Sequence, residues 1–125
     1  MTEPIAPPAT IAFIGLGMMG VPMAKRCLAA GYDVRGADPS ASAREAFASA
    51  GGKAFATGGE AAEGVSAVIT MLPNSQVVRE AVLGRDGFAD VLARDTLIID
   101  MSSSVPVDTQ DLGQALAERG LALVD

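Results

Sequence analysis

Three glycines, Gly15, Gly17 and Gly20, follow the apolar run at residues 11–14 with the spacing G-x-G-x-x-G. In a strand-to-helix turn of this kind, the first glycine permits the tight turn and the third lets the helix pack closely on the strand. The second leaves room for a pyrophosphate to approach the main chain, and the helix N-terminus offers it unpaired N–H groups. The spacing therefore predicts an anion-binding turn. A glycine-rich turn without a ligand is the alternative interpretation.

Asp38 favours the first interpretation. It ends the second strand-like run. Dinucleotide-binding turns carry an acidic residue roughly 20 positions after the last glycine, and the separation between Gly20 and Asp38 is close to that value. A carboxylate there accepts hydrogen bonds from the adenine ribose hydroxyls and repels a 2′-phosphate. The next residue is Pro39 and not a cation, so we predict NAD as the cofactor, in preference to NADP. Asp38 has an alternative role as the cap of the turn before Pro39, and the two roles are compatible.

Two further loops follow apolar, strand-like runs, at residues 71–74 and 100–106. The first is predicted to give the middle and the nicotinamide side of the cofactor a rigid apolar surface. The second carries serines that could reach the carboxamide or a substrate. In the alternative interpretation, residues of both loops only end strands and cap helices. The residues concerned are Leu72, Pro73 and Asn74 in the first loop and Ser102, Ser103 and Ser104 in the second.

These loops need a framework of alternating strands and helices. Short apolar runs bounded by turn residues predict strands at residues 10–14, 33–38, 53–56, 66–72, 96–101 and 121–124. Helical patterns lie between them, at about residues 18–30, 40–52, 58–64 and 74–84 and from Pro106 onward. This alternation is typical of an α/β fold with a doubly wound parallel sheet, a Rossmann-type dinucleotide-binding domain with strand order 3-2-1-4-5-6. In that order the glycine turn and residues 71–74 face each other across the ligand crevice.

Individual residues refine the helices. The first helix is predicted to end at Gly31, and Ser42 and Glu45 have the spacing of a capping box in the second. Residues of the helix at 74–84 that are predicted to face the core are Val77, Val78, Ala81 and Val82.

Composition limits the class of function. The 125 residues suit one domain, and 50% of them are hydrophobic but only 4% aromatic, so aliphatic side chains must fill the core. The net charge is −6 and no basic run occurs, which argues against a nucleic-acid partner. No apolar run approaches the roughly 20 residues of a membrane span. The acidic residues are scattered, so no metal site is predicted.

The chain is predicted to divide into a flexible, proline-rich lead-in at residues 1–9, which does not resemble a signal peptide, and the domain at residues 10–125. Its single cysteine, Cys27, excludes an internal disulfide and is predicted to be a buried core thiol. Such cysteine usage suits a reducing compartment, and we predict a cytoplasmic location.

Groups that transfer protons at neutral pH are scarce. The sequence contains no histidine and one tyrosine, Tyr32. Tyr32 and the lysines, Lys25 and Lys53, are all predicted to lie away from the carboxyl edge of the sheet. The sequence therefore predicts a cofactor-binding unit without its own general acid or base.

Residues 13–24, FIGLGMMGVPMA, resemble the N-terminal signature of the β-hydroxyacid dehydrogenases, G-L-G-x-M-G-x-x-M-[SA]-x-N. This family includes 3-hydroxyisobutyrate dehydrogenase and 6-phosphogluconate dehydrogenase. Two later stretches, ITMLPNSQVVREAVLG and IDMSSSVP, are similar to its second and third cofactor loops and occur in the same order. The resemblance covers about residues 10–125. Arg26 departs from the asparagine of the signature, but it lies beyond the phosphate contacts, so we expect it to leave binding intact.

The resemblance implies an NAD-dependent oxidoreductase that acts on a small 3-hydroxy acid or its semialdehyde, homo-oligomeric in its full-length form. The family's catalytic lysine and all-helical C-terminal domain would lie beyond Asp125, so we predict no catalytic residue in this chain and no activity of this chain alone. The implied cofactor-binding residues are Gly15, Leu16, Gly17, Met18, Met19 and Gly20 at the pyrophosphate, Asp38 at the adenosine ribose, Leu72, Pro73 and Asn74 along the groove, and Ser103 beside the nicotinamide ribose.

Two other functions use the same glycines. A non-catalytic nucleotide-binding module that retains the fold is the main alternative, because the sequence lacks the catalytic lysine. A domain that binds a flavin or S-adenosylmethionine is the third, but the MLPN and DMSSS loops argue against it.

Overall fold

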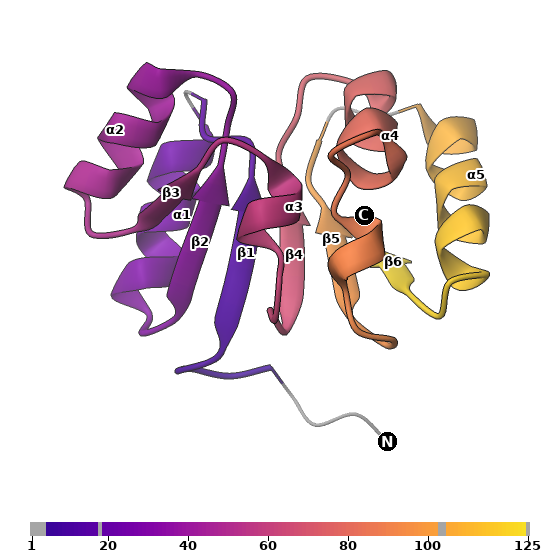
Figure 1. The fold of residues 1–125 in the computed structure, drawn as a ribbon, viewed down its shortest axis with the longest axis horizontal. Helices are drawn as coiled ribbons and strands as arrows, with labels where there is room; N and C mark the ends of the chain where they lie inside the picture. The colour runs from indigo at the N-terminus through magenta and orange to yellow at the C-terminus, as the bar shows by residue number, and fades with distance from the viewer. Residues whose placement is uncertain (1–4, 18, 103–104, 125) are drawn as a thin grey trace.

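The computed structural model of the chain describes residues 5–17, 19–102 and 105–124. Within these ranges strands and helices alternate along the chain, as the sequence predicted (Figure 1). The strands are β1 (Thr10–Ile14), β2 (Asp33–Ala37), β3 (Lys53–Phe55), β4 (Ala67–Thr70), β5 (Leu97–Asp100) and β6 (Ala122–Val124). The helices are α1 (Gly20–Ala29), α2 (Ala41–Ser49), α3 (Gly58–Ala61), α4 (Ser75–Leu83), α5 (Pro106–Ala117) and the short 3-10 helix η1 (Ala89–Val91).

The described strands form one parallel sheet in the order β3-β2-β1-β4-β5-β6. This confirms the predicted doubly wound order, in which the sheet grows outward in both directions from β1 and β4. Five neighbouring strands, from β3 to β5 across the sheet, also end in register, and the last residues of β2, β1, β4 and β5 form a continuous row across its middle. This strand-end row consists of Ala37, Ile14, Thr70 and Asp100.

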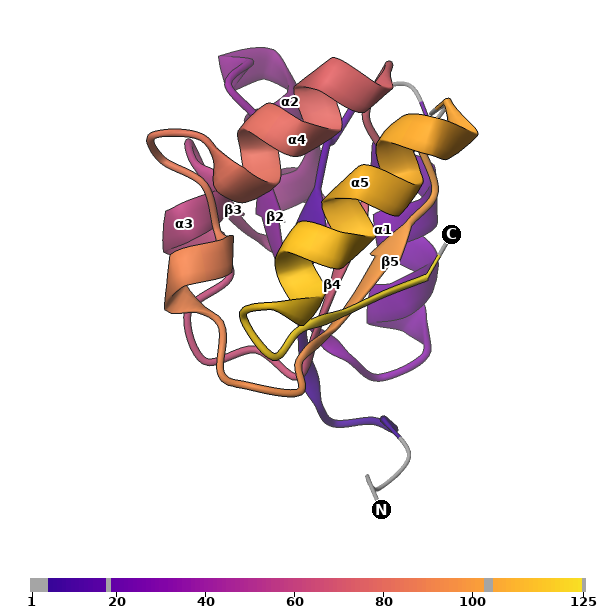
Figure 2. The ribbon, with the colours of Figure 1, turned by 90° about the vertical axis from the view of Figure 1, so that its right-hand side faces the viewer.

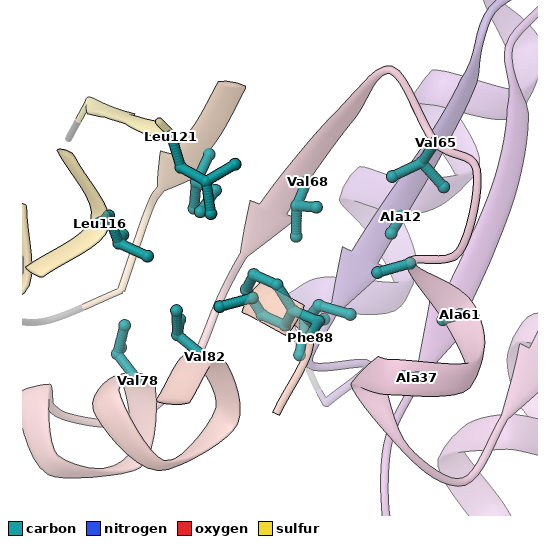
Figure 3. Close-up of a cluster of buried hydrophobic side chains, with 14 of the residues drawn as sticks. Ala12, Ala37, Ala61, Val65, Val68, Val78, Val82, Phe88, Leu116 and Leu121 are labelled. Atoms are coloured by element: carbon teal, nitrogen blue, oxygen red, sulfur yellow. The ribbon is translucent and has the colours of Figure 1, made fainter. Parts of the chain in front are cut away.

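Helices cover both faces of the sheet. α1 and α2 pack on one face around Phe13 and Phe47, and α3, α4, α5 and η1 pack on the other. Figure 2 shows α1 on one side of the strands and α3, α4 and α5 on the opposite side. In the second of these cores Phe88 is fully buried, with Val82 of α4 on one side and Ala61 of α3 on the other (Figure 3).

Helix ends follow local signals, with one difference from the prediction. α1 ends at Ala29, and Gly31 follows its C-cap as the predicted stop, because a residue with φ of +100° lets the chain turn back toward the sheet. α2 begins after Ser40, whose hydroxyl oxygen accepts a hydrogen bond from the Ala43 N–H at 3.4 Å. The predicted capping box of Ser42 and Glu45 is therefore wrong, since both residues lie inside the helix.

The remaining boundaries lie close to the predicted ones. Strands β2 to β5 each end one or two residues earlier than predicted, which leaves more of the chain for the loops. α5 begins at Pro106, as predicted, and its N-cap is Val105, which has no side chain able to cap it. Ser104, the helix cap in the alternative interpretation of this loop, lies outside the described residues.

The part of the lead-in that the structure describes contacts the amino end of β2. The Tyr32 hydroxyl donates to the Ile5 carbonyl oxygen at 3.4 Å, and the Asp33 N–H donates to the Ala9 carbonyl oxygen at 3.1 Å. This segment therefore lies at the edge of the sheet opposite to the strand-end row. None of the described helices is long and apolar enough to span a bilayer.

Candidate functional site

The loops that carry the predicted binding residues begin together at one edge of the sheet. Each follows one member of the strand-end row, so their first residues lie side by side across four strands. These first residues are Asp38, Gly15, Met71 and Met101. The edge is the carboxyl edge, where open parallel α/β sheets bind their ligands, and the crevice lies between β1 and β4.

The three glycines of the turn after β1 have different surroundings. Gly15 has φ of +105°, and a Cβ built on it would overlap the carbonyl oxygen of Met71 in the neighbouring loop. A Cβ on Gly20 would overlap the carbonyl oxygen of Gly15. A Cβ on Gly17, in contrast, would meet no atom of the described residues within 4 Å. Packing within the protein explains Gly15 and Gly20, whereas Gly17 borders open space.

The N-terminus of α1 lies directly after this open space. Among the described residues no side chain caps it, and its first turn carries no acidic residue. α2, α3 and α4 differ, because side chains of Ser40, Thr57 and Asn74 accept hydrogen bonds from their first turns. The uncapped N–H groups and the partial positive charge of the α1 helix end favour an anionic ligand.

Asp38 links the loop after β2 to the glycine turn. Its Oδ2 accepts a hydrogen bond from the Leu16 N–H at 2.8 Å, and its Oδ1 accepts one from the Ser40 N–H at 2.8 Å. The second bond is the turn cap that we predicted as its alternative role. The Leu16 side chain is buried on the α1 side of the sheet, so Leu16 faces the site through its main chain.

Arg44 is a neighbour of this loop that the sequence did not single out. Its guanidinium donates to the carbonyl oxygens of Asp38 and Pro39 at 2.8 and 2.9 Å. The signal that could have found it is weak, because an arginine in the first turn of a helix usually points into solvent. The two bonds hold the main chain of the β2 loop against the start of α2.

The loops after β4 and β5 are bonded to each other. The Leu72 N–H donates to the Ser102 hydroxyl oxygen at 2.8 Å, and the Val105 N–H donates to the Ser75 hydroxyl oxygen at 2.6 Å. Asn74 caps α4 through an acceptor contact with the Val77 N–H at 3.0 Å, which is the alternative role predicted for it. The two predicted cofactor loops therefore form one connected unit.

A cavity of about 640 Å³ lies between the glycine turn, the β2 and β3 loops and α4. This volume is in the usual range for a small-molecule site. Of the predicted binding residues, those that line the cavity are Gly15, Asp38, Leu72 and Asn74. Those that lie outside its lining are Leu16, Gly17, Met19, Gly20 and Pro73, of which Gly17, Met19 and Pro73 are exposed. Met18 and Ser103 lie outside the described residues.

α4 presents two neighbouring stripes to two different surroundings. Val78 and Val82 are buried in the core and Ala81 packs against it, as predicted, whereas Val77 is 37% exposed and lines the cavity, which Ala81 also reaches. The prediction that Val77 faces the core is therefore wrong. Because positions 77 and 81 lie one helical step from 78 and 82, the apolar face of α4 is wide enough to reach both the core and the cavity.

The charged residues of the cavity lining are mostly acidic. They are Asp38, Glu80 and Asp86, with Arg85 as the cation, and the last three come from α4 and the loop after it. The sequence analysis did not single out Glu80, Arg85 and Asp86, since they lie far from the glycine turn along the chain. The same is true of Thr57, which also lines the cavity. A ligand that brings an additional negative charge next to these residues would therefore meet net electrostatic repulsion.

The groups considered for proton transfer lie elsewhere. Tyr32 precedes β2 and Lys53 begins β3, both at the amino ends of strands, and Lys25 is exposed on α1. Burial raises the pKa of the Cys27 thiol, which is half-buried on α1 and lines a different cavity. Among the described residues no group of three or more potential metal ligands occurs.

Residues 10–125 match the family described as the NAD binding domain of 6-phosphogluconate dehydrogenase. The chain belongs to this family. As an NAD-binding domain it has the features that the fold leads one to expect: a glycine turn, an open position at Gly17 and a carboxylate after β2. The match begins at the first residue of β1.

The relatives of this NAD-binding domain are named as reductases and dehydrogenases of small hydroxy compounds. It is 38% identical over 117 residues to 3-sulfolactaldehyde reductase of Escherichia coli K12, covering 94% of this chain and 39% of that protein. It is 41% identical over 115 residues to NAD-dependent L-serine dehydrogenase of Pseudomonas aeruginosa, covering 92% and 39%. The solved 3-hydroxyisobutyrate dehydrogenase of Mycobacterium tuberculosis with L-serine is 36% identical with a TM-score of 0.86, covering 92% and 38%. The chain thus spans about two fifths of these proteins.

Proposed function

We propose that this chain is the cofactor-binding domain of an NAD-dependent dehydrogenase that interconverts a small 3-hydroxy acid and its semialdehyde. Gly17 carries the proposal, because the side chain that it lacks would occupy open space beside the uncapped end of α1. A pyrophosphate fits both features, since it needs close approach to the main chain and unpaired N–H groups. When bound, the nicotinamide supplies the hydride chemistry.

The residues of the chain bind and orient the cofactor in this proposal. The main chain at Gly17 and the first turn of α1 hold the pyrophosphate. Asp38 accepts hydrogen bonds from the ribose hydroxyls. Each of its carboxylate oxygens can do so because it keeps a second lone pair in addition to the one that bonds a backbone N–H. Leu72 and Val77 give the crevice apolar walls. The predicted roles of the other glycine-turn residues, of Pro73 and Asn74 and of Ser103 are part of the same proposal.

The charges of the cavity lining support a preference for NAD over NADP. A 2′-phosphate on the ribose would approach Asp38, and the further charged lining residues are Glu80 and Asp86 against Arg85 alone. Repulsion at a partly exposed site of this kind amounts to about 1–3 kcal/mol. We therefore propose that the domain selects the cofactor without the 2′-phosphate.

The substrate class rests on the relatives, whose names include a sulfolactaldehyde reductase and a serine dehydrogenase. Oxidation of an alcohol needs a proton acceptor beside the hydroxyl. We propose that a lysine on a separate helical domain beyond Asp125 supplies it, as the family resemblance implies. The division of the chain into residues 1–9 and 10–125, a homo-oligomeric full-length protein and a cytoplasmic location complete the proposal.

The test is a calorimetric titration of NAD+ into the wild-type chain and a Gly17→Val variant. We expect Gly17→Val to weaken binding about a hundredfold, because losing two charge-assisted bonds to phosphate costs about 3 kcal/mol. The melting temperature should stay within a few degrees of wild type, since a Cβ at this position meets no described atom within 4 Å.

The matched control is Gly113→Ala on α5, where a Cβ would make only ordinary contact with Leu123. This variant should bind NAD+ as the wild type does. Normal binding by Gly17→Val would refute the close approach of the pyrophosphate. Unfolding of Gly17→Val would show that Gly17 serves the turn and not a ligand.

A further inference from the structure

The strand-end row changes character halfway across the sheet. Ala37 and Ile14 are apolar members of the core, whereas the next two members are Thr70 and Asp100. These two polar side chains are 0% and 4% exposed. A buried hydroxyl and a buried carboxylate lower the stability of a fold unless hydrogen bonds compensate for the lost water. Two apolar residues would satisfy packing alone, so the polar pair calls for another explanation.

The bonds of this pair lead to the cofactor loops. The Thr70 hydroxyl donates to Asp100 Oδ1 at 2.9 Å, and the Ser102 N–H donates to the same oxygen at 2.9 Å. The hydroxyl oxygen of Ser102 then accepts the Leu72 N–H at 2.8 Å. Thr70 and Asp100 thus fix the start of the β5 loop, and Ser102 transmits that position to the β4 loop.

The two halves of the crevice have separate supports. The β2 loop is held by the bonds of Asp38 to the N–H groups of Leu16 and Ser40, whereas the bonds of Asp100 to Thr70 and Ser102 join the β4 and β5 sides. In a doubly wound sheet the first three strands bind one mononucleotide half and the last three bind the other. Because AMP corresponds to the first half and the nicotinamide nucleotide to the second, the supports can be tested separately.

We propose that Thr70 and Asp100 are positioning residues that act through Ser102 to hold the Leu72 main chain where it contacts the nicotinamide half of the cofactor. This inference rests on the proposed function, since it assumes that the dinucleotide lies across the crevice. Neither residue touches the cofactor in this role. Their effect is on the spacing between the β4 and β5 loops, which the shared acceptor oxygen of Asp100 sets.

The experiment compares Thr70→Val with Thr70→Ser, using NAD+ and AMP as probes in calorimetry. Valine has nearly the shape of threonine but cannot donate to Asp100, whereas serine keeps the hydroxyl. We expect Thr70→Val to weaken NAD+ binding about tenfold and AMP binding less than about twofold. Thr70→Ser should restore the NAD+ affinity. A purely structural role would weaken both ligands equally, or neither.

Two further variants keep the test decisive. Ser102→Ala removes only the last bond to Leu72 and should reproduce the selective loss even if Thr70→Val does not fold. Thr96→Val is the matched control, because Thr96 is also buried but donates to Ala93 at the opposite edge of the sheet. It should lower the melting temperature and leave the ratio of NAD+ to AMP affinity unchanged.

The outcomes separate the two proposals. Wild-type binding of both ligands with an unchanged affinity ratio in Thr70→Val and Ser102→Ala would overturn the positioning role and leave the cofactor site intact. A wild-type chain that binds neither NAD+ nor AMP would overturn the proposed function and the positioning role together.

Discussion

The carboxylate of Asp38 accepts two backbone N–H groups, from Leu16 and Ser40, and both bonds exist without any ligand. Replacement by alanine would therefore remove a ribose acceptor and also release the glycine turn from the β2 loop. A loss of NAD binding in that variant would have two causes that a single titration cannot separate. Asparagine is the better probe, because it removes the charge and keeps one acceptor oxygen.

At this residue we expect the wild type to bind NAD+ about tenfold to a hundredfold more tightly than NADP+, and Asp38→Asn to lose most of that preference. The reason is that the repulsion of a 2′-phosphate by Asp38 accounts for about 1–3 kcal/mol. Calorimetry with both cofactors measures the ratio. Asp38→Ala serves as the comparison and should also show a lower melting temperature than Asp38→Asn, since it keeps neither backbone bond.

Equal affinities of the wild type for the two cofactors would contradict this assignment. So would a preference that survives in both Asp38 variants, which would direct attention to Glu80 and Asp86 on the other side of the cavity.

α4 shows how one element serves both the core and the site. Its Val78–Val82 stripe packs beside Phe88 in the core, and its Val77–Ala81 stripe lines the cavity (Figure 3). Substitutions in the two stripes should therefore affect different properties, although the residues are adjacent in sequence.

We expect Val78→Ala to lower the free energy of unfolding by about 1–3 kcal/mol, because it leaves a void in a close-packed core. Val77→Ala should change it by less than about 0.5 kcal/mol but weaken NAD+ binding about threefold to tenfold, since the ligand loses contact with one or two methyl groups. Urea denaturation and NAD+ titration of both variants provide the comparison. The reverse pattern, with Val77→Ala the less stable variant, would contradict the assignment of the stripes.

The prediction of elements from sequence was successful where the signal is local. The strand order follows from short apolar runs, glycine stops and the alternation of strands with helices, and each run and each stop is visible within a few residues. The position of Val77 was mispredicted because the apolar residues of α4 cover more of the helix surface than the part that packs on the sheet. Periodicity alone does not say which of these residues meet the sheet. Sequence pattern likewise did not distinguish Ser40 from Ser42 as the N-cap of α2, because both serines precede apolar residues with helical spacing.

Contacts of the site between distant residues were not predictable in this way. Thr70 and Asp100 are 30 positions apart, and the pairing of β4 with β5 brings them together. The steric contact that makes Gly15 necessary was also not predictable, because the overlap there involves Met71 of another loop.

In the described part of the chain, the proposed binding groups gather at the carboxyl edge, whereas the tyrosine and the lysines lie elsewhere. Tyr32 and Lys53 lie at the amino ends of strands, and Lys25 is exposed on α1. The carboxyl edge carries Ser102, a hydroxyl too weakly basic to act unaided, and Asp100, which holds Thr70 and Ser102.

We expect residues 1–125 to bind NAD+ and to show no measurable turnover with small 3-hydroxy acids, because binding needs the carboxyl edge alone whereas oxidation of an alcohol also needs a base. The measurement is NADH absorbance over a panel of these acids, with NAD+ binding confirmed on the same preparation. A longer form of the protein that includes a downstream lysine is the positive control. Turnover by the short chain at the rate of the longer one would show that a group within these 125 residues acts as the base.

The strand-end row has a consequence for redesign. Since neighbouring strands are paired residue by residue up to this row, deletion of one residue inside β4 would turn Thr70 to the opposite face and shift the β4 loop by one position. Insertions beyond the row would leave the pairing untouched. Ile14, Ala37, Thr70 and Asp100 are therefore natural junctions at which loops from other sheets of this order can be grafted, so that ligand preference is exchanged while the framework keeps its length.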